Sequence, residues 1–440
     1  MKNERCAQLS KSICRFAAGF AAGGFLIGTT ALRGADWPQY RGPDHDGVST
    51  DKILDSWPVD GPRKLWQVPL TDGFSSFAIG QGKAFTLVAR TIDGQKQEVC
   101  VALDLDSGKE LWAAPLGQAK YEGGGDEGAP DNRGGDGPRS TPTIDGDRIY
   151  TLSAYLVLTC FEANTGKVIW SRDLLKEYGG KIITWENAAS PLIDGDLIFV
   201  NCNAPNQTLL GLHKEDGSLA WKGQNDSMTQ ATPIAATILG VRQVLFFTQS
   251  GLVSVAPQTG DVLWRYKFPY NVSTASSPVV AGDIVYCSAG YGVGSGAVRI
   301  TKSGDQFLAT EIWRIPGNKF CNHWSTPVYS NGYLYGLFGF KEHGKCPLKC
   351  LDIATGKEMW SHPGFGPGGT LLVDGKVLVL GDKGQLALVA ATPKEYIEEA
   401  RCQAVSGKCW NSPAISNGKL YARSTKEGVC LDLSAELMAK

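Results

Sequence analysis

One short pattern constrains the fold more than any other feature of this chain: a glycine followed four residues later by a tryptophan. The pattern occurs at Gly108 and Trp112, Gly166 and Trp170, Gly217 and Trp221, Gly260 and Trp264, and Gly356 and Trp360. An alternating apolar stretch precedes each glycine, and glycine readily adopts the positive φ of a tight turn, so each copy predicts a β-hairpin. Two further copies are degenerate, because Gly304 is followed by Trp313 after an insertion and Pro393 replaces the glycine in the copy that ends near Arg401.

A second signature precedes each hairpin and consists of Ser or Thr, then Pro, then two β-rich runs around a turn. Six copies begin at Thr141, Ser190, Thr232, Ser277, Thr326 and Ser412, and two copies without proline begin at Ser76 and Thr370. The signature therefore adds a second hairpin to each unit. Units of four strands that recur every roughly 40 to 60 residues are typical of propeller blades. We predict an all-β fold, an eight-bladed β-propeller of four-stranded antiparallel blades.

The two ends of the repeat region are each incomplete in a complementary way. Residues 64–68 resemble an outer tryptophan strand with no three strands before it, whereas residues 411–433 supply three strands and stop. An open solenoid would leave strand edges unpaired at both ends. We therefore expect the N-terminal outer strand to complete the last blade and close the ring.

The hairpin units resemble the tryptophan-docking repeat of the pyrroloquinoline-quinone (PQQ) propeller superfamily. The segment Cys350–Trp360 carries this resemblance most clearly, and it extends over about residues 63–433. The opening segment Trp37–Pro43, with Gly47, is similar to the N-terminal segment of exported bacterial members. The resemblance implies that each tryptophan lies between neighbouring blades. The superfamily contains quinoprotein dehydrogenases and also the propeller subunit of the outer-membrane β-barrel assembly machinery, which carries no quinone.

The N-terminus is typical of an export signal. Basic residues up to Arg15 precede a short apolar run over residues 16–32 that is rich in Gly and Ala. The alternative, a membrane anchor, requires roughly 20 strongly apolar residues. We predict a signal peptide over residues 1–35, an extended segment over 36–62, a propeller over 63–440, and a periplasmic or otherwise extracytoplasmic location for a mature chain without a membrane span. The net charge of −1 favours neither nucleic acid nor anionic lipid as a partner.

The residues that lead into each Ser/Thr signature should gather at one mouth of the central channel, because every innermost strand begins there. They are Phe74, Arg139, Glu186, Asn187, Gln230, Ser273, His323, Trp324, Trp410 and Asn411, with Trp185 adjacent. Aromatic rings, an arginine, a carboxylate and amides can stack on and hydrogen-bond to a planar anionic cofactor or a sugar. The alternative is that these polar residues line the mouth only because water enters it.

The sequence favours a binding protein over an enzyme. It lacks the adjacent Cys-Cys pair found beside the cofactor in classical quinoprotein alcohol dehydrogenases, and it contains no nucleophile elbow, phosphate-binding loop or HExxH element. We interpret the chain as a monomeric, non-catalytic binding or assembly scaffold of the cell envelope. Its expected partner at the mouth is an envelope protein, a glycan or a small planar anion. The alternative is a PQQ-dependent alcohol or sugar dehydrogenase, for which the resemblance implies PQQ with calcium.

Most cysteines are predicted to act as small buried residues. The position six residues before each turn is occupied by Ala102, Cys160, Gly211, Ser254, Val298, Cys350, Ala387 and Cys430, almost all of them small. Cys402 and Cys409 flank a short polar connection and are the best local candidates for a disulfide. No metal site is predicted, because Cys346 and Cys350 with His343 lack a second ligand pair, and the acidic insertion Tyr121–Arg139 fits no calcium-loop spacing.

Overall fold

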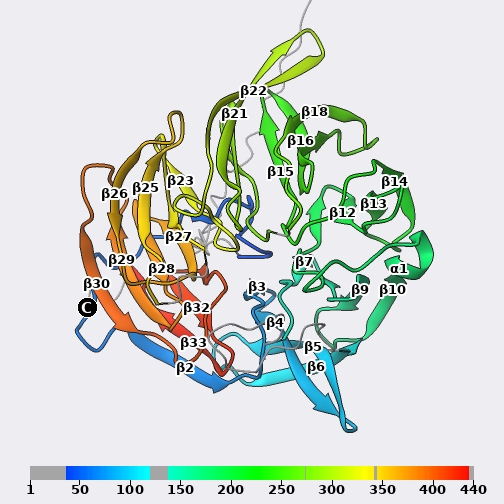
Figure 1. Ribbon diagram of the computed structural model, residues 1–440. Coiled ribbons are helices and arrows are strands. Elements are labelled where there is room, and N and C mark those ends of the chain that lie inside the picture. The colour runs from blue at the N-terminus through cyan, green and yellow to red at the C-terminus, as the bar shows by residue number, and fades with distance from the viewer. Residues whose placement is uncertain (1–35, 119–136, 273, 341–343, 436–440) are drawn as a thin grey trace, which may run out of the picture. The chain divides into compact units, whose positions relative to one another are not determined.

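The computed structural model describes residues 36–118, 137–272, 274–340 and 344–435, and within these it confirms the predicted all-β propeller. Eight sheets follow one another around a ring in chain order (Figure 1). Each contains antiparallel strands, which are connected in sequence except where two strands from the N-terminal region join the last two blades. The predicted signal peptide, Ser273, His343 and most of the acidic insertion lie outside the described residues.

The first four blades are regular four-stranded sheets. Blade 1 comprises β3 (Ala78–Gly80), β4 (Lys83–Ile92), β5 (Gln95–Asp104) and β6 (Glu110–Gln118). Blade 2 comprises β7 (Thr143–Asp145), β8 (Arg148–Leu152), β9 (Val157–Glu162) and β10 (Val168–Asp173). Blade 3 comprises β11 (Leu192–Asp194), β12 (Leu197–Asn201), β13 (Leu209–His213) and β14 (Leu219–Gly223). Blade 4 comprises β15 (Ile234–Ile238), β16 (Val241–Thr248), β17 (Gly251–Val255) and β18 (Val262–Lys267).

The second half of the ring contains the long hairpin and the closure. Blade 5 comprises β19 (Val279–Ala281), β20 (Ile284–Ala289), β21 (Gly294–Ser303) and β22 (Gln306–Ile315). Blade 6 comprises β23 (Val328–Ser330), β24 (Tyr333–Leu337), β25 (Leu348–Asp352) and β26 (Glu358–His362). Blade 7 comprises β27 (Gly369–Val373), β28 (Lys376–Leu380), β29 (Gln385–Ala390) and β30 (Glu398–Gln403), with β1 (Val48–Ser49) added in parallel to β27. Blade 8 comprises β31 (Ala414–Ser416), β32 (Lys419–Arg423), β33 (Glu427–Asp432) and β2 (Arg63–Pro69).

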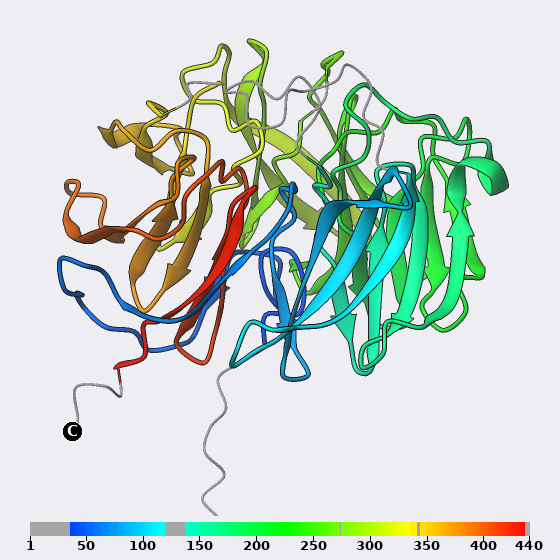
Figure 2. The same cartoon turned by 90° about the horizontal axis from the view of Figure 1, so that it is seen from below.

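The chain ends close the ring as predicted. The N-terminal strand β2 pairs antiparallel with β33, so it provides the outer strand of blade 8, and Figure 2 shows blue β2 beside red β33. An ion pair of 2.7 Å between Arg63 and Asp432 lies at one end of this pairing. Closure thus removes the unpaired edge that three strands alone would leave.

Six tryptophans join neighbouring blades by the same contact. Trp66, Trp112, Trp170, Trp221, Trp313 and Trp360 donate Nε1–H to the carbonyls of Leu105, Ala163, Lys214, Pro257, Ile353 and Thr392 in the next blade, over 2.7 to 3.3 Å. Five of these indoles also lie directly against the turn glycine of the next hairpin, where a Cβ would collide with the ring. The Gly and Trp of the repeat are therefore contact partners between blades, as the family resemblance implied.

Two blades depart from this contact. Trp264 of blade 4 donates to Oε1 of Gln243 in its own blade over 2.7 Å. Nothing lies within 4 Å of a Cβ added at Gly304, in the turn of the long β21–β22 hairpin, so the Gly–Trp contact is not made there. Blade 7 has Arg401 in place of the tryptophan. The Arg401 guanidinium lies 4.7 Å from the centre of the Phe365 ring and donates twice to Glu398.

The residue opposite each tryptophan is small in every blade. The pairs are Ala102 with Trp112, Cys160 with Trp170, Gly211 with Trp221, Ser254 with Trp264, Ala297 with Trp313, Cys350 with Trp360 and Cys430 with Trp66, and Ala387 faces Arg401. The prediction of Val298 was wrong by one residue, because the longer hairpin of blade 5 moves its turn and so changes the spacing from Gly304 back to the small residue.

Hydroxyl groups of the Ser/Thr signature connect the innermost strands around the channel. The amide of Ser76 donates to Oγ1 of Thr141, whose amide donates to Oγ of Ser190, whose amide donates to Oγ1 of Thr232, over 2.9 to 3.0 Å. The amide of Ser277 donates to Oγ1 of Thr326 in the same way over 3.0 Å. These bonds explain the hydroxyl residue at Thr141, Ser190, Thr232 and Thr326, since a buried amide without a partner would be unfavourable.

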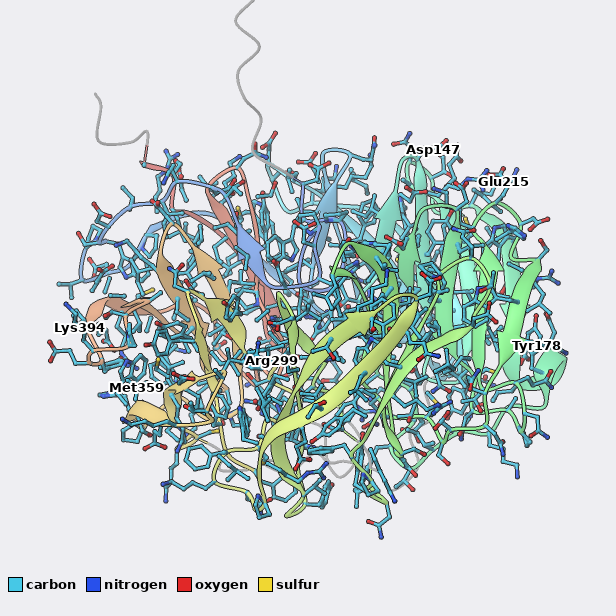
Figure 3. All side chains as sticks on the ribbon, turned by 90° about the horizontal axis from the view of Figure 1, so that it is seen from above. Asp147, Tyr178, Glu215, Arg299, Met359 and Lys394 are labelled. Carbon is cyan, nitrogen blue, oxygen red and sulfur yellow. The ribbon has the colours of Figure 1, made fainter. Side chains whose placement is uncertain are left out.

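The two faces of the ring carry different parts of each blade. The turns between first and second strands and between third and fourth strands share one face, and Figure 3 shows Asp147 and Glu215, from one turn of each kind, at the same rim. A 2.7 Å ion pair between Arg148 and Glu215 joins these turns across blades. The leading residues and the loops between second and third strands therefore lie on the opposite face, which we call the mouth face. The short helix α1 (Leu174–Tyr178) follows blade 2.

The first part of the N-terminal segment (residues 36–62), from Trp37 to Ser49, lies inside the ring, which the sequence did not predict. In Figure 1 this dark blue segment crosses the middle of the ring. The amide and carbonyl of Trp37 both pair with Ile79, and the amide of Leu372 donates to the carbonyl of Gly47. The buried Arg41 guanidinium donates to the carbonyls of Thr326 and Pro327, each over 2.8 Å. The segment therefore joins blades that are distant in the sequence.

Candidate functional site

Seven rings form a continuous series of contacts on the mouth face. We call Phe74, Trp185, Tyr291, His323, Trp324, Phe340 and Trp410 the mouth cluster. Trp410 stacks on Phe74 with ring centres 5.1 Å apart and contacts Trp324 at 5.0 Å, and Trp324 contacts His323 at 4.8 Å. Tyr291 lies 5.1 Å from His323, 4.5 Å from Phe340 and 5.9 Å from Trp185. Phe74 is buried, and the other six residues are half-buried.

Three residues near this cluster were missed by the sequence analysis. Tyr291 lies in the loop between β20 and β21, and Phe340 follows β24 in the corresponding loop of blade 6. Lys408 lies in the connection from β30 to β31, with its Nζ 4.7 Å from the Trp410 ring centre. These positions vary from blade to blade, so the repeat does not reveal them. Blade topology could have indicated Tyr291 and Phe340, because every loop between second and third strands opens on the mouth face.

Arg139 and Gln230 hold the backbone around Trp185. Nη1 of Arg139 donates to the Trp185 carbonyl over 2.6 Å, and Nε2 of Gln230 donates to the carbonyls of Trp185 and Glu186 over 3.0 and 2.9 Å. Trp185 and Glu186 have φ values of 68° and 55°, which are uncommon for residues other than glycine. Such conformations persist where surrounding contacts hold them and are frequent at functional sites. Arg139 and Gln230 thus position Trp185 within the mouth cluster.

The remaining predicted residues differ in their environments. The Glu186 side chain is 1% exposed, and its carboxylate lies 3.7 Å from Nη1 of Arg139. Asn187 bonds locally, accepting from the Ala189 amide and donating to the carbonyls of Ala189 and Ser153. Asn411 is buried, and its side-chain Nδ2 and Oδ1 have no hydrogen-bond partner among the described residues. The structure therefore brings His323, Trp324 and Trp410 together but does not direct all the predicted polar groups to one ligand position.

The described residues do not fit PQQ held with calcium between the predicted tryptophans. A flat ring bound between two others requires about 7 Å between their planes, twice the usual carbon contact distance. The centre of the Trp410 ring is already only 5.0 Å from that of Trp324 and 5.1 Å from that of Phe74. Calcium requires several oxygen ligands, and no three His, Cys, Asp or Glu groups of the described residues converge to hold a metal ion.

Cys160, Cys202, Cys350 and Cys430 are buried thiols rather than reactive groups. Burial raises the pKa of Cys160 and Cys202 to about 11 and that of Cys350 and Cys430 to about 12. Cys402 and Cys409 are both free thiols, so the suggested disulfide is not formed. Cys409 is buried and its amide donates to the Asp382 carbonyl, whereas Cys402 lies on β30 beside Gly61.

The fold and the docking contacts define a closed β-propeller of tryptophan-docked blades. The sequence profile of the family described as "Outer membrane protein assembly factor BamB" matches residues 95–321, slightly more than half of the chain. The chain therefore belongs to this family.

Individual relatives agree with this assignment. The outer membrane protein assembly factor BamB of Moranella endobia (strain PCIT) is 25% identical over 328 residues, which is 72% of this chain and 66% of that protein. The crystal structure of BamB from Moraxella catarrhalis matches with a TM-score of 0.57 at 15% identity, covering 84% of this chain and 97% of the other. Quinohemoprotein alcohol dehydrogenase from Comamonas testosteroni matches with a TM-score of 0.64 at 12% identity, covering 90% and 80%. The last two likenesses show the fold alone.

No helix within the described ranges is long and apolar enough to cross a membrane.

Proposed function

We propose that this chain is an exported, non-catalytic scaffold that takes part in the assembly of outer-membrane proteins. Family membership supports this proposal, because both the family and the Moranella endobia relative carry the description of an outer membrane protein assembly factor. The apolar run over residues 16–32 supports export to the periplasm. On this reading, the chain acts as a monomer that binds another envelope protein.

The mouth cluster carries the proposal for where the partner binds. The cluster presents six half-buried rings on one face of the protein. Aromatic residues often dominate protein interfaces, because a large ring removes much apolar surface from water with little loss of side-chain freedom. Lys408 lies over the Trp410 ring at the edge of the cluster and adds a positive charge there. The support from Arg139 and Gln230 keeps Trp185 in place before binding, which lowers the entropy cost of association.

The same rings could also stack on a glycan or a planar anion, and the dehydrogenase alternative requires such a ligand. The contacts of Trp410 with both Phe74 and Trp324 favour a protein partner, because they leave the cluster as a surface rather than a slot. A glycan or PQQ is therefore an outcome that the test must separate from protein binding.

Site-specific cross-linking in the source cells tests this function. A photoreactive phenylalanine analogue at position 410 should form cross-links to a subunit of the outer-membrane assembly machinery, identified by mass spectrometry. Trp324→Ala and Lys408→Glu should each reduce co-isolation of that subunit several-fold, because a few central residues dominate an interface. Leu308→Ala is the matched control, since Leu308 is 63% exposed on the long hairpin of blade 5 and lies outside the cluster.

Three results would contradict the proposal. Unchanged co-isolation with Trp324→Ala and Lys408→Glu, at unchanged melting temperature, would remove the mouth cluster as the binding surface. Cross-links only to proteins outside outer-membrane assembly would remove the assembly role. Heat of binding with PQQ and calcium, together with dye-linked oxidation of an alcohol or aldose, would establish the dehydrogenase alternative.

A further inference from the structure

A cavity of about 350 Å³ lies inside the ring between the N-terminal segment and the innermost strands of blades 4 and 5. Residues 234–237 and 278–280 provide its largely apolar walls. Arg242 and Gly282 also line it, and both lie near turns between first and second strands, so the cavity lies toward the face opposite the mouth cluster. The N-terminal segment contributes Arg41, Asp44, His45 and Asp46. Its volume lies within the range of small-ligand sites.

The charged groups of this cavity favour a cation. Arg242 is neutralised by a bidentate contact with Asp194, and the Arg41 guanidinium donates to backbone carbonyls. In the part of the chain that the structure describes, neither Asp44, which is exposed, nor Asp46, which is half-buried, forms a close ion pair, although the Arg41 charge acts on Asp46. Burial is the main cause that raises the pKa of Asp46; Asp44 adds to the rise, while the Val48 amide and Arg41 oppose it. A bound cation would favour the ionised form of Asp46 and so offset the effect of burial.

The chemistry of the lining indicates an organic cation rather than a metal ion. Within the described residues no three His, Cys, Asp or Glu groups are placed to hold a metal. His45 is buried, and its Nε2 faces Nε2 of Gln39 at 3.1 Å, so this nitrogen accepts a hydrogen bond and is engaged. Two carboxylates beside apolar walls fit a primary ammonium group on an aliphatic stem, because the stem can pack on the walls while the ammonium donates to the carboxylates.

The walls also present backbone groups that an extended chain could pair with. β15 and β19 are each the terminal strand of their sheet, so their inner edges have no strand partner. In blades 1, 2 and 7 the N-terminal segment bonds to the equivalent edges, through the amides of Ile79, Ile144 and Leu372. Between residues 36–62 and β15 or β19, all of which the structure describes, no backbone hydrogen bond is formed. The edges beside the cavity therefore remain open to a short extended segment.

We propose that this cavity binds a lysine side chain or amino terminus presented on a short extended peptide, with the ammonium at Asp44 and Asp46 and the peptide backbone along the inner edge of β15 or β19. The site is separate from the mouth cluster and does not depend on the function proposed there. It gives the ring a second position at which a peptide segment of a partner can be held.

Calorimetric titration of the full chain tests this proposal with three probes. Acetyl-alanyl-lysyl-alanine amide should bind, and the same peptide with norleucine in place of lysine should bind at least tenfold more weakly, because it lacks the ammonium. Cadaverine supplies the ammonium without a peptide backbone and should bind more weakly than the lysyl peptide. Equal affinity for cadaverine and the lysyl peptide would overturn the backbone contribution, and equal affinity for the two peptides would overturn the ammonium site.

Variants of the chain provide the second arm. Asp44→Asn should weaken binding of the lysyl peptide about tenfold, the effect of losing one charge-assisted contact. Ala236→Leu should weaken it similarly by filling the cavity without changing its charge. Asp60→Asn, an exposed change on the same segment outside the cavity, should leave affinity unchanged. Melting temperatures verify folding, and unaltered affinity in both Asp44→Asn and Ala236→Leu would overturn the proposal.

Discussion

The indole of Trp66 lies directly over Gly108, so that the strand completing the last blade docks on the hairpin turn of the first. Its Nε1 donates to the Leu105 carbonyl over 2.9 Å, and a Cβ added at Gly108 would lie 2.8 Å from Cδ2 of Trp66. Gly108 has a φ of +70°, so glycine is required here both for backbone conformation and for space.

We expect Gly108→Ala to destabilise the chain more than Gly146→Ala. Both glycines have positive φ, at +70° and +58°, so both changes incur the left-handed backbone penalty of roughly 1 to 2 kcal/mol. Only at Gly108 does the new methyl group also collide with an indole, because nothing lies within 4 Å of a Cβ at Gly146. Urea denaturation measures both free energies of unfolding, and equal losses would contradict the docking contact.

Deletion of Arg63–Leu70 should destabilise the whole ring. The deletion removes β2, exposes the edge of β33 and leaves Cys430 without the indole that covers it. Because the blades are joined into one closed ring, the loss should appear as one cooperative transition at lower temperature. Calorimetric melts of the full and shortened chains measure it, and an unchanged midpoint would show that this strand does not close the ring.

Cys160→Ala should cost roughly 1 kcal/mol or less, whereas Cys160→Leu should cost several times more. Cys160 faces Trp170, and the equivalent positions hold Ala102, Ala297 and Gly211 in other blades. A larger side chain would displace the indole from its contact with blade 3. Denaturation of the two variants decides this, and a large loss for the alanine variant would indicate that the thiol has a role beyond filling space.

Acidification should destabilise the chain partly through His45. Burial, with a further contribution from Arg242, lowers the pKa of His45 to about 4, whereas an unfolded histidine titrates near 6.5. Asp194 acts in the opposite direction, and Arg41 in the same direction as Arg242. As the pH falls from 6.5 to 4, the unfolded chain takes up a proton that the folded chain does not, so stability present above pH 6.5 is progressively lost.

His45→Gln should therefore reduce the pH dependence of stability. The loss from this one group between pH 7 and pH 4.5 is roughly 2 to 3 kcal/mol in the wild type. Glutamine does not titrate and can still accept from Gln39, which keeps the local contact. Melting temperatures of both chains over this pH range test the prediction, and identical slopes would show that the fold does not lower the pKa of His45.

The regular part of the fold was predictable because the sequence of each blade carries its own copy of the strand and turn pattern. Strand alternation, the turn glycine and the Ser/Thr signature are local, and eight copies of them identify the blades and the closing strand. The single error in the small positions, Val298 in place of Ala297, occurred where the insertion in blade 5 lengthens the hairpin and changes the spacing from the turn. Where blade 5 departs from its siblings, spacing no longer reports which residues are paired.

The candidate sites were only partly accessible from the sequence. Position in the repeat placed Trp324 and Trp410 on one face, and the structure brings these rings into contact. Position in the repeat did not show that Arg139 donates to the Trp185 carbonyl, nor that Tyr291 belongs to the mouth cluster. Both contacts depend on loops that differ between blades.

The sequence alone thus determined the strand order within a blade, the number of blades and the closing strand. Hairpins depend on residues that are close in the sequence, and the same pattern recurs in eight units. The tertiary structure alone decided what fills the ring. The carbonyls of Thr326 and Pro327 that bind Arg41 lie more than 280 residues away along the chain. A buried charged group requires hydrogen-bond acceptors, and these come from whichever parts of the folded chain lie next to it. No local sequence pattern predicts which residues those are.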